Sequence, residues 1–540
     1  MYQRLSGGTV YDPANQINGQ VKDIWLRDGK IVEPPEDPSV STSTTNVSGM
    51  VVMPGGVDMH CHIAGPKVNA ARKMQPEMTR WATESGEMAN VPDIFSTGER
   101  YTGLGYTTCF DAAISPLSVR HVHHEFGQIP NVDTGFFVLV GNNHQVMEMV
   151  AQKDIAGLEA FLGWLLKKTG GYAPKLVNPG GVELWKQSRE GNARDLDQTI
   201  DGFDTTPRQI IESLVNASNA LGLPHPAHIH CNNLGVPGNW KTTLETMRIL
   251  SGQKAHLTHI QFHSYGGGEE DEGSLCSQVK PLAEWINQQQ DVTVDVGQVM
   301  FGPTTSMTAD GPLGHYLHQI HGNKWYSMDT EVESGCGVSP IEYRNKNLVH
   351  ALQWAIGLEW YLMVDDPWKV VMSTDHPNGG SFLAYPQIIR FLMDRSYRAE
   401  KLAESNPRVR QFCSLGDLNR EYTLNDIAII TRAGPARILG LKNKGHLGIG
   451  ADADITVYAP DENYETMFSV PRWVIKGGEM IVDDYEVKRS AQGNTLAVAT
   501  EYDFNRNATI ENWFDDRYSL KSNHFGIRDG EFERVKIVES

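Results

Sequence analysis

The chain has 540 residues, a net charge of −19 and six cysteines, and 40% of its residues are hydrophobic. Because this length exceeds what one compact core supports, two or more structural units are expected. The acidic balance excludes a general affinity for nucleic acids, which requires basic groups to displace phosphate counterions. The cysteines are scattered without any Cys-x-x-Cys pair, so we predict neither a disulfide framework nor an iron–sulfur cluster, as suits a reducing cytoplasm.

No apolar run reaches the length of a membrane span. The longest, at residues 348–364, carries His350, Gln353 and Glu359 and is typical of a buried amphipathic helix. The N-terminus lacks the apolar core of a signal peptide. We therefore expect a cytoplasmic protein without membrane contact.

Short strands are predicted at both ends of the chain. A Pro/Ser/Thr-rich segment at 34–47 interrupts the first group and is predicted to be a loop. Since neither end makes a comfortable domain alone, residues 1–50 and 425–500 are expected to form one composite β-sandwich domain, with 501–540 as a C-terminal extension. The predicted strands lie at residues 8–11, 21–26, 30–32, 448–458 and 474–482.

Apolar strands alternate with helical stretches between these two ends. Strands that alternate with helices form a parallel sheet, and a count of eight predicts a closed (β/α)8 barrel of the TIM type over residues 51–424. Functional residues of such a barrel lie at the carboxyl ends of its strands. The predicted strands are 51–60, 105–113, 133–142, 173–179, 226–232, 255–263, 291–300 and 369–376, with helical segments at 155–168, 207–221, 275–289 and 345–363.

The first of these strands ends in two histidines separated by one residue. Side chains alternate along a strand, so His60 and His62 are expected on one face and Cys61 on the other. Two imidazoles on one face make half of a nitrogen-rich site suited to zinc. The alternative is a pair of hydrogen-bonded polar residues in a core.

The fourth strand carries a lysine among apolar residues. Lys175 is costly to bury as a cation. It is either a surface lysine at a frayed strand end or a neutral amine. A neutral amine can capture carbon dioxide as a carbamate, whose two oxygens can bridge two metal ions.

Same-face histidines recur on the fifth and sixth predicted strands, whereas His256 on the sixth faces the other way. The eighth strand closes on the carboxylate of Asp375, next to His376. The same-face pairs are His228 with His230 and His259 with His263.

This arrangement of His-x-His, Lys, His, His and Asp on strands one, four, five, six and eight resembles the amidohydrolase superfamily, particularly its hydantoinase and dihydroorotase branch. Within that superfamily four stretches are similar to the A component of formylmethanofuran dehydrogenase. They are equally similar to its relative in the formyltransferase/hydrolase complex of methylotrophic bacteria. The stretches read PGGVDMHCHIAGPKVN, KLVNPGG, HCNNLGVPGN and HLTHIQFHSYGGG.

The resemblance implies a site for two zinc ions. One zinc would be held by the first-strand histidines, a carboxylated Lys175 would bridge both ions, and Asp375 would complete the site and act as general acid and base. His263 stands as an alternative to His259, while His228 and His376 would be hydrogen-bonding neighbours. The implied ligands are His60, His62, Lys175, His230, His259 and Asp375.

The implied reaction is hydrolysis, or the reverse condensation, of the N-formyl group of formylmethanofuran or formylmethylofuran to formate and the free furfurylamine. Lys67 and Asn69 are expected to bind this carrier, whose tail contains glutamates, whereas Arg72 and Lys73 are as readily part of a solvated loop. The partners would be the other subunits of a formyltransferase/hydrolase or dehydrogenase complex.

Two other functions remain open at this point. A free-standing cyclic amidase keeps the metal site and changes the substrate. A metal-free scaffold protein keeps only the barrel. Between the two complexes, a composition rich in Gln and Asn and moderate in charge favours the bacterial one over a hyperthermophile's enzyme.

Overall fold

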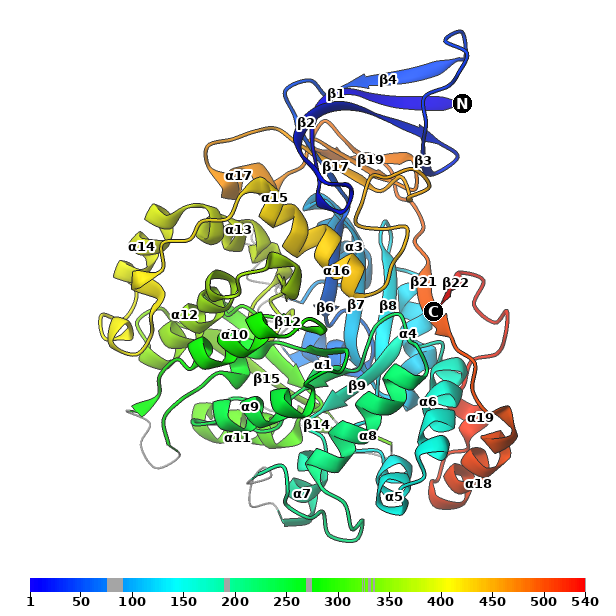
Figure 1. The fold of residues 1–540 in the computed structure, drawn as a ribbon, viewed down its shortest axis with the longest axis vertical. Coiled ribbons are helices and arrows are strands. Elements are labelled where there is room, and N and C mark those ends of the chain that lie inside the picture. Colours follow the sequence, from blue (N-terminus) through cyan, green and yellow to red (C-terminus); the bar gives the residue numbers. More distant parts are fainter. Residues whose placement is uncertain are drawn as a thin grey trace.

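The structure is a computed structural model that describes residues 1–74, 91–188, 195–268, 274–322, 324, 326–328, 332–333 and 336–539. A central barrel is covered by helices, and a mixed sheet from both chain ends lies at one end of it (Figure 1). Within the described ranges, no helix is long and apolar enough to cross a membrane.

All eight predicted barrel strands are present, and each neighbouring pair is parallel. The ring closes between its last and first strands through a parallel bridge from Cys61 to His376, where the His62 amide donates to the His376 carbonyl at 2.8 Å. The (β/α)8 prediction is therefore confirmed. The strands are β6 (Gly56–Cys61), β7 (Tyr106–Ile114), β8 (Asp133–Leu139), β9 (Ala173–Val177), β10 (His228–His230), β11 (Ala255–Leu257), β12 (Val292–Asp295) and β16 (Val370–Val371).

Amphipathic helices between these strands bury their apolar faces against the sheet in one continuous core. The four predicted helical segments correspond to α6, α8, α10 and α12. The helices are α1 (Pro66–Met74), α3 (Ile94–Gly103), α4 (Val119–Phe126), α5 (His144–Gln152), α6 (Ile155–Thr169), α7 (Gly181–Ser188), α8 (Pro207–Ala220), α9 (Trp240–Ile249), α10 (Val279–Gln288), α12 (Leu348–Met363), α13 (Tyr385–Met393), α14 (Arg395–Glu404), α15 (Leu424–Ala428), α16 (Gly434–Ile438), α17 (Tyr464–Ser469), α18 (Asn507–Arg517) and α19 (Ser522–Phe525).

The chain ends meet in one nine-stranded sheet, as the alternation at both ends predicted. The loop predicted at 34–47 is wrong in part. Residues 42–46 form an exposed strand that pairs in parallel with β1, a contact that local composition does not reveal. The strands are β1 (Tyr2–Asp12), β2 (Ile17–Arg27), β3 (Lys30–Val32), β4 (Thr42–Asn46), β5 (Val51–Pro54), β17 (Ile455–Tyr458), β18 (Trp473–Lys476), β19 (Glu479–Asp483) and β20 (Glu486–Val487).

Strand β5 joins this sheet to the barrel. The run predicted as one strand at 51–60 is divided, because β5 pairs with β1 and β17 whereas β6 enters the barrel. Glycine is required at the join, since a Cβ on Gly55 would lie 2.2 Å from the Thr107 hydroxyl and one on Gly56 2.7 Å from the Tyr106 ring. The first histidine strand is thus anchored in the composite sheet.

The predicted domain boundaries at 50/51, 424/425 and 500/501 stay a prediction, but two strands pair with the unit on the other side of a boundary. Strand β5 lies in the nine-stranded sheet, and β21 (Thr495–Ala499) pairs with the start of barrel strand β8. Strand β22 (Val535–Glu539) extends β21 in parallel.

A buried ion cluster fastens the composite sheet to the barrel. Asp133, the first residue of β8, accepts from Lys476 at 2.6 Å, and Lys476 also donates to Asp454 at 2.7 Å. Lys444 lies 3.0 Å from Asp454, so two lysines neutralise carboxylates from both units. The cluster lies away from the carboxyl ends of the strands and is structural.

An insertion between β12 and α12 covers the carboxyl end of the barrel. It contains β13 (Gly302–Thr308), α11 (Gly311–His321), β14 (Tyr326–Met328) and β15 (Cys336–Tyr343), with β15 between the other two strands. No sequence pattern used above predicts this sheet.

Candidate metal centre

The first-strand histidines converge on the eighth-strand carboxylate. The Nε2 atoms of His60 and His62 lie 2.9 Å and 3.0 Å from Oδ1 of Asp375. All three side chains are buried, and Cys61 faces the other way, where its thiol donates to the Phe110 carbonyl. Two imidazole nitrogens and one carboxylate oxygen therefore meet at a single point.

The electrostatics of this group favour an ionised carboxylate. The pKa of Asp375 lies well below its ordinary value, because burial, which raises it, is outweighed by the charge of His60 and by hydrogen bonds from His60 and His62. Burial lowers the pKa of His60, but the carboxylates of Asp295 and Asp375 outweigh it and raise that pKa to about 9. Asn378 donates to Asp375 Oδ1 at 2.9 Å and holds it in place.

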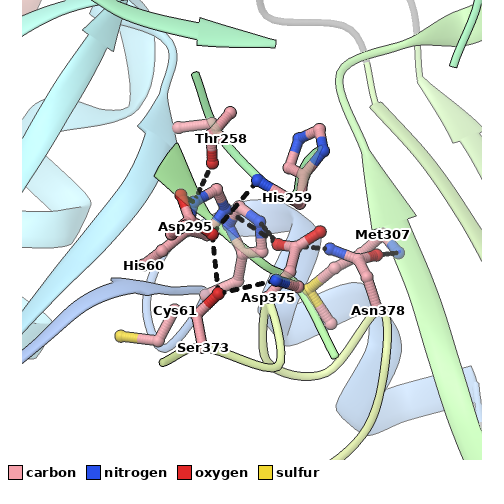
Figure 2. A network of polar contacts seen from close by, with 12 residues as sticks. His60, Cys61, Thr258, His259, Asp295, Met307, Ser373, Asp375 and Asn378 are labelled. Atoms are coloured by element: carbon pink, nitrogen blue, oxygen red, sulfur yellow. Dashed lines mark hydrogen bonds and ion pairs between the residues drawn. The ribbon is translucent and has the colours of Figure 1, made fainter. Parts of the chain in front are cut away.

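Asp295, at the end of β12, connects three of the strands that carry predicted site residues (Figure 2). Its Oδ2 lies 3.1 Å from Nδ1 of His60 and 3.1 Å from Nε2 of His256. Its Oδ1 accepts from the His259 amide at 3.1 Å and from the Ser373 hydroxyl at 2.6 Å. A carboxylate on the far nitrogen of a histidine fixes its ring and tautomer, leaving Nε2 for a metal ion.

Other groups also crowd Nδ1 of His60. Nε2 of His228 lies 3.2 Å from it, and the hydroxyl of Thr258 contacts it as well. The other ring nitrogen of His228, Nδ1, lies 3.0 Å from Nε2 of His225. These contacts place His228 behind His60 rather than among the groups that face Asp375.

Lys175 lies inside the barrel and is only 1% exposed. Among the described residues its Nζ has no hydrogen-bond partner. Burial lowers the pKa of Lys175 to about 7, partly countered by the carboxylates of Asp295 and Asp375. A buried amine that loses its proton near neutrality is suited to carbamate formation.

A second histidine group lies beside the first. One nitrogen of each of His230, His259 and His263 lies within 4.8 Å of the others. The ring centroid of His259 is 4.5 Å from that of His230 and 5.3 Å from that of His60, which links the two groups. In the described part of the chain, Nδ1 of His259 and both ring nitrogens of His263 are buried without a partner.

The sixth-strand histidines share a side for a reason other than the predicted one. Strand β11 ends at Leu257, so the prediction of alternation along a strand through 263 is wrong. His259 adopts a left-handed conformation (φ 36°), and a 3-10 helix over Ile260–His263 turns His263 back toward it. Gly297 packs against this turn, where a Cβ would lie only 2.5 Å from that of His259.

A cavity of about 280 Å³ opens onto both groups. Its polar floor contains the six predicted ligands and Lys67, while residues of the insertion and of α12 form a largely apolar wall. Lys67 donates to the Ala113 carbonyl at 2.7 Å. Asn69 is not among the lining residues and donates instead to Glu125 at 2.6 Å. The structure thus brings Lys67, and not Asn69, to the site.

Two buried carboxylates of the site were missed from the sequence. Asp295 could have been predicted from the sequence, because it ends the apolar strand VTVD in the same way that Asp375 lies at the end of the eighth predicted strand. Asp310 had none, since it belongs to the unpredicted insertion. Its Oδ2 lies 3.1 Å from Nε2 of His230.

The donor set fits a pair of metal ions. Imidazole nitrogens and carboxylate oxygens are the groups that zinc prefers, and partnerless buried nitrogens on His259, His263 and Lys175 face no competing protein group among the described residues. Such orphaned polar atoms are costly unless a ligand satisfies them.

Comparison with known proteins defines the class. The model of the Amidohydrolase family matches residues 44–482, so the chain belongs to the amidohydrolase family. The chain is 43% identical to protein FwdA of Methanocaldococcus jannaschii over 92% of this chain and 90% of that protein. It is 35% identical to the A component of the formyltransferase/hydrolase complex Fhc of Methylorubrum extorquens, over 98% of this chain and 97% of that component.

A solved structure matches the whole chain. The crystal structure of the formyltransferase/hydrolase complex FhcABCD from Methylorubrum extorquens, in complex with methylofuran, contains a chain that superposes with a TM-score of 0.93 at 32% identity, covering 100% of both chains. This agreement extends to the composite sheet and the insertion as well as the barrel.

Proposed function

We propose that this chain hydrolyses the N-formyl group of a formylated furfurylamine carrier, formylmethanofuran or formylmethylofuran, to formate and the free amine, or runs the reverse condensation. It would do so as the hydrolytic subunit of a formyltransferase/hydrolase or formylmethanofuran dehydrogenase complex. The observation that carries the proposal is the convergence of His60 and His62 on Asp375, beside the amine of Lys175, which has no hydrogen-bond partner in the described part of the chain. Two relatives support the choice of carrier and partners, because one is named as part of a formyltransferase/hydrolase complex and the solved complex contains methylofuran.

Two zinc ions would be held by His60, His62, His230, His259, Asp375 and a carbamate on Lys175. Bound there, they would supply an acidified water and polarise a carbonyl oxygen. The chain's own contribution is to orient these groups and to move a proton. Asp375, ionised by its surroundings, can accept the proton of the attacking water and return it to the nitrogen of the departing amine.

The bond changes in this reaction balance without an electron carrier. The carbonyl carbon gains the water oxygen, the C–N bond breaks, and the amine takes the proton. Lys67 lies at the cavity floor with a buried amine, which supports its proposed role in binding the carrier. Asn69, on the same helix α1, donates to Glu125 and does not line the cavity, so we assign it no direct contact with the carrier.

Elemental analysis of purified protein is expected to find close to two zinc ions per chain. Chelation should abolish hydrolysis, and restoring zinc should restore it, because the attacking water depends on the ions. Full activity in a sample shown to be metal-free would contradict the metal site and favour a different catalytic group.

Formate release from an N-formyl furfurylamine is expected under anaerobic conditions with no electron acceptor, for the chain alone or in a complex stripped of redox subunits. Hydrolysis needs only water, a polarised carbonyl and Asp375. A cyclic ureide or dihydroorotate serves as the comparison substrate and should not be cleaved at a similar rate. If formate appears only after an acceptor is added, the hydrolase assignment is wrong.

A further inference from the structure

Two asparagines from the KLVNPGG and HCNNLGVPGN stretches join a hydrogen-bonded chain that ends on His230. Nδ2 of Asn232 donates to Oδ1 of Asn178 at 2.9 Å and to the Pro179 carbonyl at 2.9 Å. Nδ2 of Asn178 donates to Oδ1 of Asp310 at 3.1 Å. The other oxygen of Asp310 contacts Nε2 of His230 at 3.1 Å, and all these polar side chains are buried.

The donor and the acceptor at each step of this hydrogen-bonded series follow from the chemistry of the groups. A carbonyl oxygen can only accept, so the atom of Asn232 that faces Pro179 is the amide nitrogen. The atom of Asn178 that this nitrogen also meets must then be the oxygen, and its own nitrogen therefore faces Asp310. Asp310 accepts at one oxygen and presents the other, an acceptor too, to the His230 ring.

We propose that Asp310 is a positioning residue that fixes the tautomer of His230, with the proton on Nε2, so that Nδ1 is the nitrogen presented to the second metal ion. This inference rests on the two-metal site proposed above. A metal-bound histidine commonly donates its other ring N–H to a carboxylate, which orients the ring and raises its basicity. Asp295 stands in the same relation to His60 at the first metal position.

Asp310 also links the insertion between β12 and α12 to the predicted metal ligands. Asp310 immediately precedes α11, outside the barrel, and its own amide donates to the Thr308 hydroxyl at 2.9 Å. From β13 of the same insertion, the Met307 amide donates to Asn378 at 2.7 Å, and Asn378 donates to Asp375. The insertion that covers the cavity therefore contacts one predicted ligand, His230, directly and reaches another, Asp375, through Asn378.

Substituting Asp310 by asparagine tests the proposal because it reverses the chemistry without changing the shape. Asn178 would still donate to the new amide oxygen, so the amide nitrogen would face His230 and donate to Nε2. The proton of His230 would then move to Nδ1, which could no longer bind a metal ion. Asp310→Ala only removes the acceptor and leaves the ring free to choose a tautomer.

The measurement is zinc content at a series of buffered free zinc concentrations, which gives a Kd for each metal. Asp310→Asn is expected to weaken the second zinc by about 10- to 100-fold, the usual effect of losing such a partner, and to leave the first within about twofold. The affinity for the second zinc should fall less in Asp310→Ala than in Asp310→Asn. Asp310→Glu keeps a carboxylate, so its affinity should lie between those of Asp310→Asn and the unmodified protein. A merely structural role predicts the opposite order, since asparagine is the closer replacement in shape.

Asp12→Asn is the matched control. Asp12 is also fully buried and also accepts from an asparagine, Asn15, at 2.7 Å, but it lies in the composite sheet. The Asp12→Asn variant should bind both zinc ions with the affinities of the unmodified protein. Thermal unfolding in the presence of a chelator checks that every variant is folded.

Nitrogen-15 NMR of the metal-free, histidine-labelled protein gives an independent readout. His230, assigned by its loss in His230→Gln, should carry its proton on Nε2 in the unmodified chain and on Nδ1 in Asp310→Asn. An unchanged tautomer, or unchanged zinc affinity in Asp310→Asn, would overturn the inference. Fewer than two zinc ions in the unmodified protein would instead count against the proposed metal site, while the tautomer measurement would still decide the role of Asp310.

Discussion

Replacing Lys175 by alanine is expected to release zinc and to lower formate production by about 10³-fold or more. Lys175 is the buried amine placed where a bridging anion is needed, and losing the ions forfeits several kcal/mol of transition-state stabilisation. Zinc content and the rate of formate release are measured on the same preparation. Short carboxylates such as acetate or propionate are expected to restore part of both by occupying the bridge.

Lys254→Ala serves as the control for this substitution. Lys254 is an exposed lysine immediately before β11, at the opposite end of the barrel, and should be dispensable for zinc and for turnover. If Lys175→Ala keeps its full metal content, the lysine is not a ligand. Rescue by a carboxylate and not by chloride would separate a bridging role from a general effect of salt.

Asp375→Asn is expected to keep much of the zinc while turnover falls by about 10²- to 10⁴-fold, the usual contribution of a positioned acid or base. The amide preserves the shape of the side chain and one oxygen toward the histidines, but it cannot accept the proton of water or return it to the amine. The measurement compares kcat for formate release with zinc per chain.

Asp291→Asn is a suitable comparison, because Asp291 is exposed at the start of the seventh barrel strand and far from the carboxyl ends. It should behave like the unmodified protein. A loss of zinc in Asp375→Asn that fully accounts for the loss of turnover would show Asp375 to be a ligand only. Unchanged turnover would remove it from the mechanism.

The barrel was predictable because its signals are local. Each buried parallel strand is a short apolar run bounded by helix or turn residues, and those runs are readable one at a time. The edge strand β4 was not, since its sequence TSTTN is polar and only its pairing with β1 makes it a strand. The sharp turn at His259 was missed for a similar reason: it depends on Gly297, which lies on another strand's loop.

In the candidate site too, residues on predicted strands could be found from the sequence, whereas residues placed by distant contacts could not. The predicted ligands lie within or just after strands whose order along the chain was predicted, so the carboxyl edge of the barrel brings them to one cavity. Asp310 could not be placed, because nothing in the residues around it tells where the insertion folds back. Asn178 and Asn232 could be seen as part of conspicuous stretches, but their shared partner became visible only in three dimensions.

The pairing of β5 with β17 has a consequence for how the protein is made. The strand that leads into His60 takes one of its two neighbours from residues near the N-terminus and the other from Ile455–Tyr458, about four hundred residues later. During translation its second edge therefore stays unpaired until most of the chain has left the ribosome, and such distant pairing is slow and exposed to misfolding. His60 in β6 and His62 just after it are therefore secured only late in synthesis, and a nascent chain cut short before β17 would carry these two histidines after a strand with one unpaired edge.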